Sequence, residues 1–235
     1  MKIEIWSDVM CPFCYIGKRN FEKALEQFSN KDKLQIIWKS FQLDPSIPEL
    51  AKESYLQYLV INKGMTEQEV STMLQNVTQM AKNAGLEYHF DKSVMVNSFK
   101  AHRLIQLSKT KGLGEEAEEL LFKAFFTDSG NIADQATLTM IGKEIGISEN
   151  EVIEALTDQK YADMVNQDIE EARSIGVNGV PFFVFNRKYA VSGAQPPQAF
   201  LQTLEKSFSE WQEANPELKI EITKGQSCSI DGTCS

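Results

Sequence analysis

The stretch MKIEIWSDVMCPFCYIGK, residues 1–18, decides the fold of this chain. Residues 2–6 are typical of a short buried strand. Proline is favoured at the first position of a helix, so Pro12 predicts a helix that runs to about Phe28 and leaves Cys11 at its N-terminal edge. A second strand is predicted over residues 34–38. This strand–helix–strand unit of about forty residues favours a right-handed crossover between two parallel strands.

The pair Cys11 and Cys14 carries the chemistry that the sequence indicates. Two cysteines three positions apart at a helix start can close a disulfide with little backbone movement. The sulfur of Cys11 points toward unpaired N–H groups and the positive end of the helix dipole, and both stabilise a thiolate, the nucleophile of disulfide exchange. Cys14 lies one turn into the helix, where we expect it to be more buried and to act as the resolving thiol.

Two other interpretations of this pair stay open. Cys11 and Cys14 could form half of a zinc site completed by Cys228 and Cys234, or they could be inert thiols in the core. Structural zinc sites of this kind usually lie on loops with short Cys–Cys spacings, whereas this pair opens a long helix directly after a strand. We therefore favour a redox pair and expect no metal site.

The rest of the chain divides into a helical block and a second piece of sheet. Residues 182–185 and 189–191 predict two strands joined by the tight connection 186–188, which is a hairpin signal. Thr66 with Glu69 predicts a capping box. The predicted fold class is α/β, with a small sheet assembled from the two outer segments and helices on its faces. Helices are predicted over residues 52–63, 66–84, 97–111, 114–128, 134–145, 149–157, 160–175 and 197–213.

The segment Gly179-Val180-Pro181 comes directly before the third predicted strand. About one X-Pro bond in twenty is cis in folded proteins, but the nearby Cys-x-x-Cys helix changes the interpretation. A cis proline turns the N–H and C=O of the preceding residue outward, where they can hold an extended substrate beside the reactive sulfur. We expect a cis Val180–Pro181 bond, and we expect both residues to bind substrate together with Pro12 and Phe13.

Three separated motifs, in this order, resemble a known family. They are W-S-D-V-M-C-P-F-C-Y-I-G-K at residues 6–18, N-S-F-K-A-H-R-L at 97–104, and G-V-N-G-V-P-F-F-V-F with V-S-G-A-Q-P at 176–196. The chain up to Glu213 resembles the thioredoxin superfamily, its DsbA branch, and within that branch the FrnE-type group of cytosolic oxidoreductases. The related 2-hydroxychromene-2-carboxylate isomerases share the fold, use glutathione and usually carry serine where Cys11 stands.

The resemblance implies a thioredoxin-like fold with a large all-helical insertion. We expect a core from residues 1–40 and 177–213, an insertion over 41–176 that forms one wall of a substrate groove, and a tail over 214–235. It implies a nucleophilic Cys11 and a resolving Cys14 that exchange disulfides through a mixed-disulfide intermediate. The expected substrates are thiol or disulfide proteins or small molecules. No metal or organic cofactor is required, and glutathione is a candidate co-substrate.

Two positions depart from the family pattern. Many thioredoxin-like proteins place a buried acid six residues before the first cysteine, where it accepts the proton of the resolving thiol. That position is Ile5 here, so the proton must leave through water or another group. DsbA carries histidine between its cysteines, where this chain has Phe13, so the pair itself does not predict a strongly oxidising potential.

Four further residues are candidates for supporting roles. Cys228 and Cys234 are separated by a turn-forming linker and are either a second dithiol that relays electrons to Cys11 and Cys14 or incidental surface thiols. We expect His102 to be a hydrogen-bonded structural residue on a helix rather than a catalytic one. We expect Asp8 to cap the loop before Cys11 rather than tune its thiolate.

The composition excludes several classes of protein. The 235 residues are 42% hydrophobic and 24% charged, as in ordinary globular proteins, and the net charge of −9 argues against a nucleic-acid groove or a polybasic membrane contact. No apolar run approaches the roughly 18 residues that span a bilayer. No secretory signal pattern follows Met1, so we expect a cytoplasmic protein.

The alternative functions are a glutathione-dependent isomerase and a zinc-stabilised, non-catalytic binding module. The oligomeric state stays open.

Overall fold

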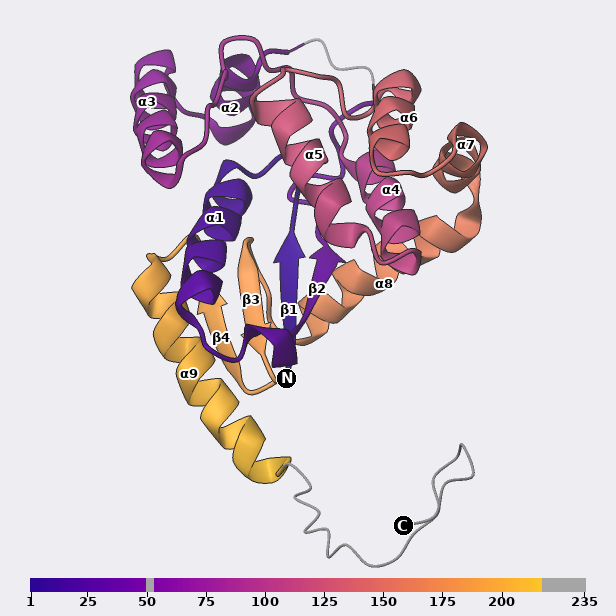
Figure 1. Cartoon of the computed structure of the whole chain (residues 1–235). Helices are drawn as coiled ribbons and strands as arrows, with labels where there is room; N and C mark the ends of the chain where they lie inside the picture. Colours follow the sequence, from indigo (N-terminus) through magenta and orange to yellow (C-terminus); the bar gives the residue numbers. More distant parts are fainter. Residues whose placement is uncertain (50–52, 217–235) are drawn as a thin grey trace, which may run out of the picture.

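The computed structural model describes residues 1–49 and 53–216, which contain a mixed sheet of four strands. The tail cysteines Cys228 and Cys234 lie outside these residues, so their proposed relay stays a prediction. The strand order is β2-β1-β3-β4 (Figure 1), with β1 parallel to β2 and β3 antiparallel to both β1 and β4. The α/β class predicted from the sequence is therefore correct. The strands are β1 (Lys2–Ser7), β2 (Gln35–Ser40), β3 (Phe182–Phe185) and β4 (Tyr189–Ser192).

The first helix, α1 (Pro12–Gln27), connects the two parallel strands as predicted. Pro12 occupies its first turn and Cys11 is its N-cap residue, although the Cys11 side chain makes no capping hydrogen bond. A single 3₁₀ turn, η1 (Lys31–Lys33), leads into β2. The β3–β4 hairpin is also present, and it turns through Asn186 and Arg187, whose φ angles of 49° and 55° are both left-handed.

The helical block lies between β2 and β3 in the sequence, and its elements follow the predicted spans closely. The helix α2 begins at Tyr55 rather than near residue 52, because Ser54 and Gln57 form a capping box that fixes its start. The predicted capping box of Thr66 and Glu69 is present as well. The helices are α2 (Tyr55–Lys63), α3 (Glu67–Ala84), α4 (Phe99–Thr110), α5 (Gly114–Phe126), α6 (Gln135–Glu144), α7 (Glu149–Thr157) and α8 (Gln159–Ser174).

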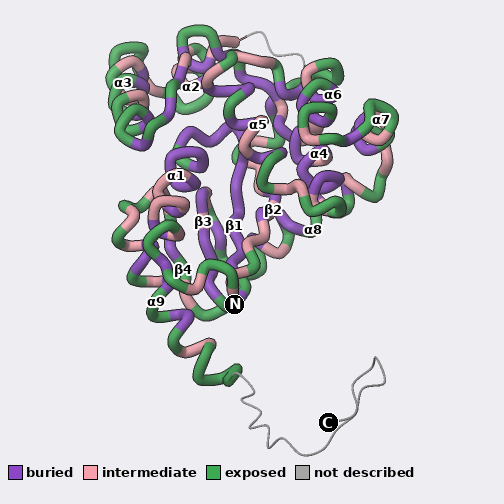
Figure 2. Tube along the Cα trace, in the orientation of Figure 1, coloured by how far each residue is buried: buried purple, intermediate pink, exposed green. Residues whose placement is uncertain are grey.

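Helix α1 connects two separate hydrophobic cores. Its C-terminal half buries Phe21 against β3 and against α9 (Pro197–Ala214), where Phe183 and Phe200 are fully buried. Its N-terminal half belongs instead to the core of the helical block, where Tyr15 stacks on Phe122 with ring centroids 4.8 Å apart. Figure 2 shows the buried residues gathered along the central strands and inner helices. The start of α1 therefore lies where the two cores meet.

A buried carboxylate on α8 ties the sheet to the helical block. The Asp168 carboxylate accepts hydrogen bonds from the N–H of Ser40 at 3.0 Å and from Nε2 of Gln106 at 2.6 Å. It also forms ion pairs with Lys39 at 2.9 Å and Lys109 at 3.1 Å. These contacts join β2, α4 and α8 at one point. Among the described residues, none of the helices is both long and apolar enough to cross a membrane.

Candidate active site

The two cysteines of the Cys-x-x-Cys motif lie at the end of β1, where the chain turns into α1. The N–H of Cys11 donates to the carbonyl of Asp8 at 2.9 Å, and the N–H of Cys14 donates to the carbonyl of Cys11 at 3.0 Å. Both cysteines are free thiols. Cys11 is 3% exposed and Cys14 is 1% exposed. The predicted order of burial is correct, but the difference is small.

The predicted cis bond between Val180 and Pro181 is present beside Cys11. The Cys11 thiol donates to the carbonyl oxygen of Val180, with 3.5 Å between Sγ and oxygen. Gly17 of α1 permits this close approach, because a Cβ at that position would lie 3.0 Å from Cγ of Pro181. The structure thus brings together two segments that are far apart in the sequence.

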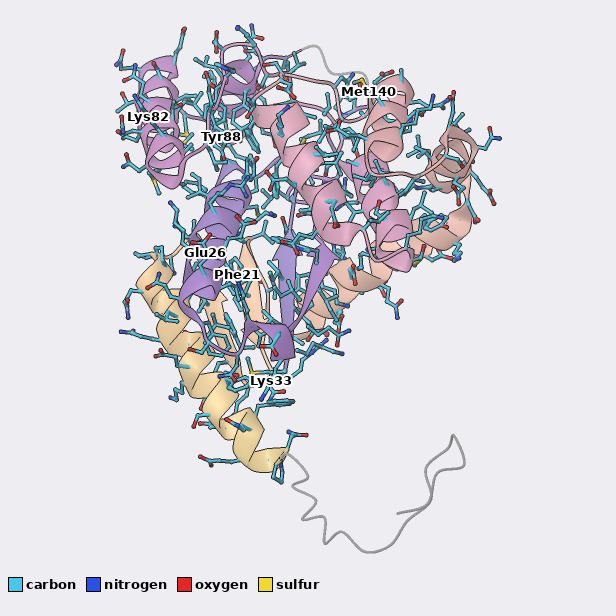
Figure 3. The ribbon with its side chains drawn as sticks, in the orientation of Figure 1. Phe21, Glu26, Lys33, Lys82, Tyr88 and Met140 are labelled. Atoms are coloured by element: carbon cyan, nitrogen blue, oxygen red, sulfur yellow. The ribbon has the colours of Figure 1, made fainter. Side chains whose placement is uncertain are left out.

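The four residues predicted to bind substrate differ in accessibility. Phe13 is 37% exposed and Val180 is half-buried, whereas Pro12 and Pro181 are buried. The carbonyl of Pro12 accepts a hydrogen bond from Oη of Tyr88 at 2.7 Å, and Figure 3 shows Tyr88 near the N-terminal end of α1. Phe13 and Val180, rather than the two prolines, are therefore accessible for direct contact with a substrate side chain.

A hollow of about 490 Å³ lies between Phe13 and α3. Its apolar lining includes Met80, which is 42% exposed. Exposed apolar side chains beside a reactive group are candidates for binding a partner's apolar side chain. The residues that line the hollow are Phe13, Gln68, Glu69, Thr72, Met73, Asn76, Val77 and Met80.

The side chains of Asp8 and His102 lie next to each other, beside the loop that precedes Cys11. The buried Asp8 carboxylate accepts from the N–H groups of Met10 at 3.3 Å and Leu43 at 2.8 Å, so its predicted role in capping this loop is correct. His102 is buried on α4 as expected, with Nε2 3.4 Å from Oδ1 of Asp8. The expected hydrogen bond of His102 is absent, because neither ring nitrogen has a hydrogen-bond partner among the described residues.

The Cys14 thiol ionises less readily than an exposed cysteine. Burial is the largest cause that raises the pKa of Cys14 well above its usual value, and the adjacent Cys11 side chain raises it further. Contacts with the backbone of Asp8 and the side chain of Ser7 oppose this shift in part. Cys14 therefore stays protonated at neutral pH.

The sequence analysis missed Glu118, a buried acid that interacts with Ser7 and His102. Glu118 is 2% exposed on α5, in a run of acidic residues that looks like a solvated surface. Its position three residues before Leu121 and four before Phe122 could have indicated an inward orientation, because both are fully buried at helical spacing. Its neighbour Glu119 instead anchors α5 to α1 through ion pairs with Lys18 at 2.8 Å and with Arg19.

The zinc interpretation depends on Cys11 and Cys14 together with the two tail cysteines. Within residues 1–49 and 53–216, no group of three or more His, Cys, Asp or Glu side chains could hold a metal ion. A four-cysteine site would also need Cys228 and Cys234, which lie outside the described residues.

Comparisons with known proteins agree with this geometry. The model of the DSBA-like thioredoxin domain matches residues 2–205. A probable DsbA oxidoreductase from Streptomyces coelicolor is 33% identical over 100% of this chain and 98% of that one, with a TM-score of 0.85. The uncharacterized protein YwbO of Bacillus subtilis is 29% identical over 185 residues, which are 77% of this chain and 85% of YwbO.

Two further solved structures share the fold at low sequence identity. The cytosolic disulfide reductase DsbM of Pseudomonas aeruginosa is 14% identical with a TM-score of 0.63, covering 89% of this chain and 100% of DsbM, and it has also been solved with GSH. A 2-hydroxychromene-2-carboxylate isomerase is 13% identical with a TM-score of 0.66, covering 92% of this chain and 98% of the isomerase. The family match over most of the chain decides the assignment: this protein belongs to the family of DSBA-like thioredoxin domains.

Proposed function

We propose that this protein is a thiol–disulfide oxidoreductase in which Cys11 is the nucleophile and Cys14 the resolving thiol. The observation that carries the proposal is the position of Cys11. Its sulfur lies at the N-terminus of α1, with Cys14 one turn away and with the carbonyl of Val180 at 3.5 Å. Membership of the DSBA-like family supports the same chemistry. The cytoplasmic location expected from the sequence stays a prediction.

The exchange runs in two balanced steps. In the reducing direction, the Cys11 thiolate attacks one sulfur of a substrate disulfide, and the other substrate sulfur leaves as a thiolate. The Cys14 sulfur, once deprotonated, attacks Cys11 in the resulting mixed disulfide. The Cys11–Cys14 disulfide forms, the second substrate thiolate leaves, and two electrons have passed to the substrate. The oxidising direction is the same sequence in reverse.

The site supports a substrate that is a peptide or protein as well as a small thiol. Phe13, two residues after Cys11, lines one hollow together with apolar residues of α3, and this hollow offers a surface for an apolar side chain next to the substrate cysteine. The DsbM structure with GSH supports glutathione as a co-substrate that reduces or oxidises the pair. The insertion, which supplies α3, would then form one wall of the substrate groove.

Trapping the mixed disulfide tests the proposal directly. A Cys14→Ser variant, made with Cys228→Ser and Cys234→Ser, is expected to retain a glutathione adduct on Cys11 after treatment with glutathione disulfide, because no thiol remains to resolve it. Mass spectrometry of proteolytic peptides locates the adduct. The matched Cys11→Ser variant should give no adduct on Cys14, whose thiol is buried and stays protonated. Adduct formation on Cys14 at a similar rate would reverse the assigned roles.

The Phe13→Ser substitution is expected to separate protein substrates from small ones. It removes part of the apolar surface, so kcat/KM for a disulfide-bonded protein substrate should fall about five- to tenfold, which corresponds to roughly 1 kcal/mol of lost apolar contact. The value for glutathione disulfide should change less than about twofold. Met140→Ser, at an exposed methionine on α6 far from α1 (Figure 3), is the control. Equal losses for both substrates would place Phe13 outside the binding surface.

A further inference from the structure

A cluster of buried polar side chains lies behind the dithiol. It consists of Ser7 at the end of β1, Asp8 in the following loop, His102 on α4 and Glu118 on α5, and we call it the Glu118 cluster. Each of the four is at most 2% exposed. Figure 1 shows α4 and α5 side by side, and they pack closely against each other. The exchange steps described above use none of these residues.

The Glu118 cluster has more polar atoms than the described protein groups satisfy. Oε1 of Glu118, Oγ of Ser7 and both ring nitrogens of His102 have no hydrogen-bond partner among the described residues. A buried polar atom without a partner costs about 1–3 kcal/mol, and such atoms are usually bonded to ordered water where no protein group reaches them. The cluster therefore has the character of a site that holds and passes protons.

Ser7 connects the Glu118 cluster to the resolving thiol. Its side chain contributes to lowering the pKa of the Cys14 thiol and the pKa of the Glu118 carboxyl group. Its buried Oγ has no hydrogen-bond partner among the described residues, so ordered water can join it to both groups. Because a hydroxyl group can donate one hydrogen bond and accept another, it can pass a proton between a thiol and a carboxylate. The order of groups is thus Cys14, Ser7 and Glu118.

Cys14 needs such a route because it reacts as a thiolate. The thiol is 1% exposed, so bulk water does not reach its proton. We propose that Glu118 accepts the proton of the Cys14 thiol, through the hydroxyl of Ser7, when Cys14 resolves the mixed disulfide. This proposal rests on the exchange mechanism proposed above. It gives Glu118 a role in moving a proton, which it performs through Ser7 rather than by touching the substrate.

The proton transfer balances with the bond changes at sulfur. The S–H bond of Cys14 breaks, and the Ser7 hydroxyl takes that proton as it gives its own to Glu118. The Cys14 thiolate attacks the sulfur of Cys11, the Cys11–Cys14 bond forms, and the substrate sulfur leaves with the electron pair of the broken bond. Glu118 then returns its proton to water or to the leaving thiolate. No oxidant or reductant beyond the substrate is needed.

The charges around Glu118 suit a group that accepts a proton near neutral pH. Burial is the main cause that raises the pKa of Glu118 to about 6, and the nearby Asp8 carboxylate raises it too. Ser7, His102 and Lys18 act in the opposite direction. Lys109 on α4 also interacts with Glu118. The carboxylate is ionised at pH 7, yet it is more basic than an exposed glutamate and so accepts a proton more readily.

Rapid mixing of the reduced protein with glutathione disulfide separates the two steps. Formation of the adduct on Cys11 reports the first step, and its loss reports resolution by Cys14. In the parent protein, resolution should slow as the pH falls through about 6, where Glu118 gains a proton. Glu118→Gln should remove this inflection and slow resolution at pH 7 about tenfold or more, with the first step changed less than about twofold.

Three variants make the result specific. Glu118→Asp should restore the inflection, Ser7→Ala should slow resolution in the same way as Glu118→Gln, and Glu116→Gln, at an exposed position of the same helix, should change neither step. If Glu118→Gln fails to fold, Ser7→Ala decides alone. The proton route would be overturned if both Glu118→Gln and Ser7→Ala formed the adduct and then resolved it with the rate and the pH profile of the parent protein. The absence of any adduct on Cys11 in the Cys14→Ser variant would overturn the proposed function itself.

Discussion

Replacing Cys11 with serine is expected to lower the rate of disulfide exchange about a thousandfold or more while the protein remains folded. The serine hydroxyl does not ionise near neutral pH and cannot form the mixed disulfide that the proposed mechanism requires. The measurement is the reduction of glutathione disulfide and of a disulfide-bonded protein under identical conditions. The largest effect on activity is expected here because the first covalent bond forms at this sulfur.

The same substitution should leave the stability of the protein unchanged or slightly improve it. Cys11 is the N-cap of α1 and makes no side-chain capping hydrogen bond, whereas serine is among the preferred N-cap residues. Thermal unfolding of the parent and the variant checks this. Loss of activity with an unchanged melting temperature would separate chemistry from folding. A variant that retains a tenth or more of the activity would mean that a thiol other than Cys11 performs the attack.

Replacing Asp168 with alanine is expected to have the largest effect on stability, a loss of about 3 kcal/mol or more. The substitution leaves Lys39 and Lys109 without their shared carboxylate, and it removes the acceptor for Ser40 N–H and Gln106. Chemical denaturation at pH 7 measures the change in the free energy of unfolding. Glu170→Ala, at an exposed position of α8, is the control and should cost less than about 0.5 kcal/mol.

The effect of Asp168 should depend on pH in a defined direction. Burial acts to raise the pKa of Asp168, but the ammonium of Lys109 and hydrogen bonds from Lys39 and Ser40 outweigh it, so the pKa is lowered on folding. A lowered pKa stabilises the folded state above the unfolded pKa of about 3.9, and this contribution is lost as the pH falls through the folded value. The difference between parent and Asp168→Ala should therefore shrink below about pH 4. A difference that stays constant down to pH 2 would exclude this ionic contribution.

The sequence by itself determined the local structure of this protein. Pro12 fixed the start of α1, Thr66 with Glu69 fixed the start of α3, and left-handed residues at 186 and 187 closed the hairpin. These features depend on contacts within about four residues, so their signals are present in short stretches of sequence. The Cys-x-x-Cys spacing at a helix start belongs to the same group, so the pair Cys11 and Cys14 could be identified from the sequence alone.

Only the tertiary structure decided what surrounds that pair. Glu118 is one of several acidic residues in its stretch of the sequence, and it is buried beside Ser7 and His102 only because α5 packs with that face inward. His102 lies against Asp8 because α4 packs beside the loop before Cys11, and Phe13 gains a binding surface because α3 lies next to it. Asp168 meets its partners across more than 50 residues of sequence. The physical reason is the same in each case: the sequence shows that a side chain is charged or apolar, but only long-range packing decides whether water or protein surrounds it, and that environment sets its pKa and its role.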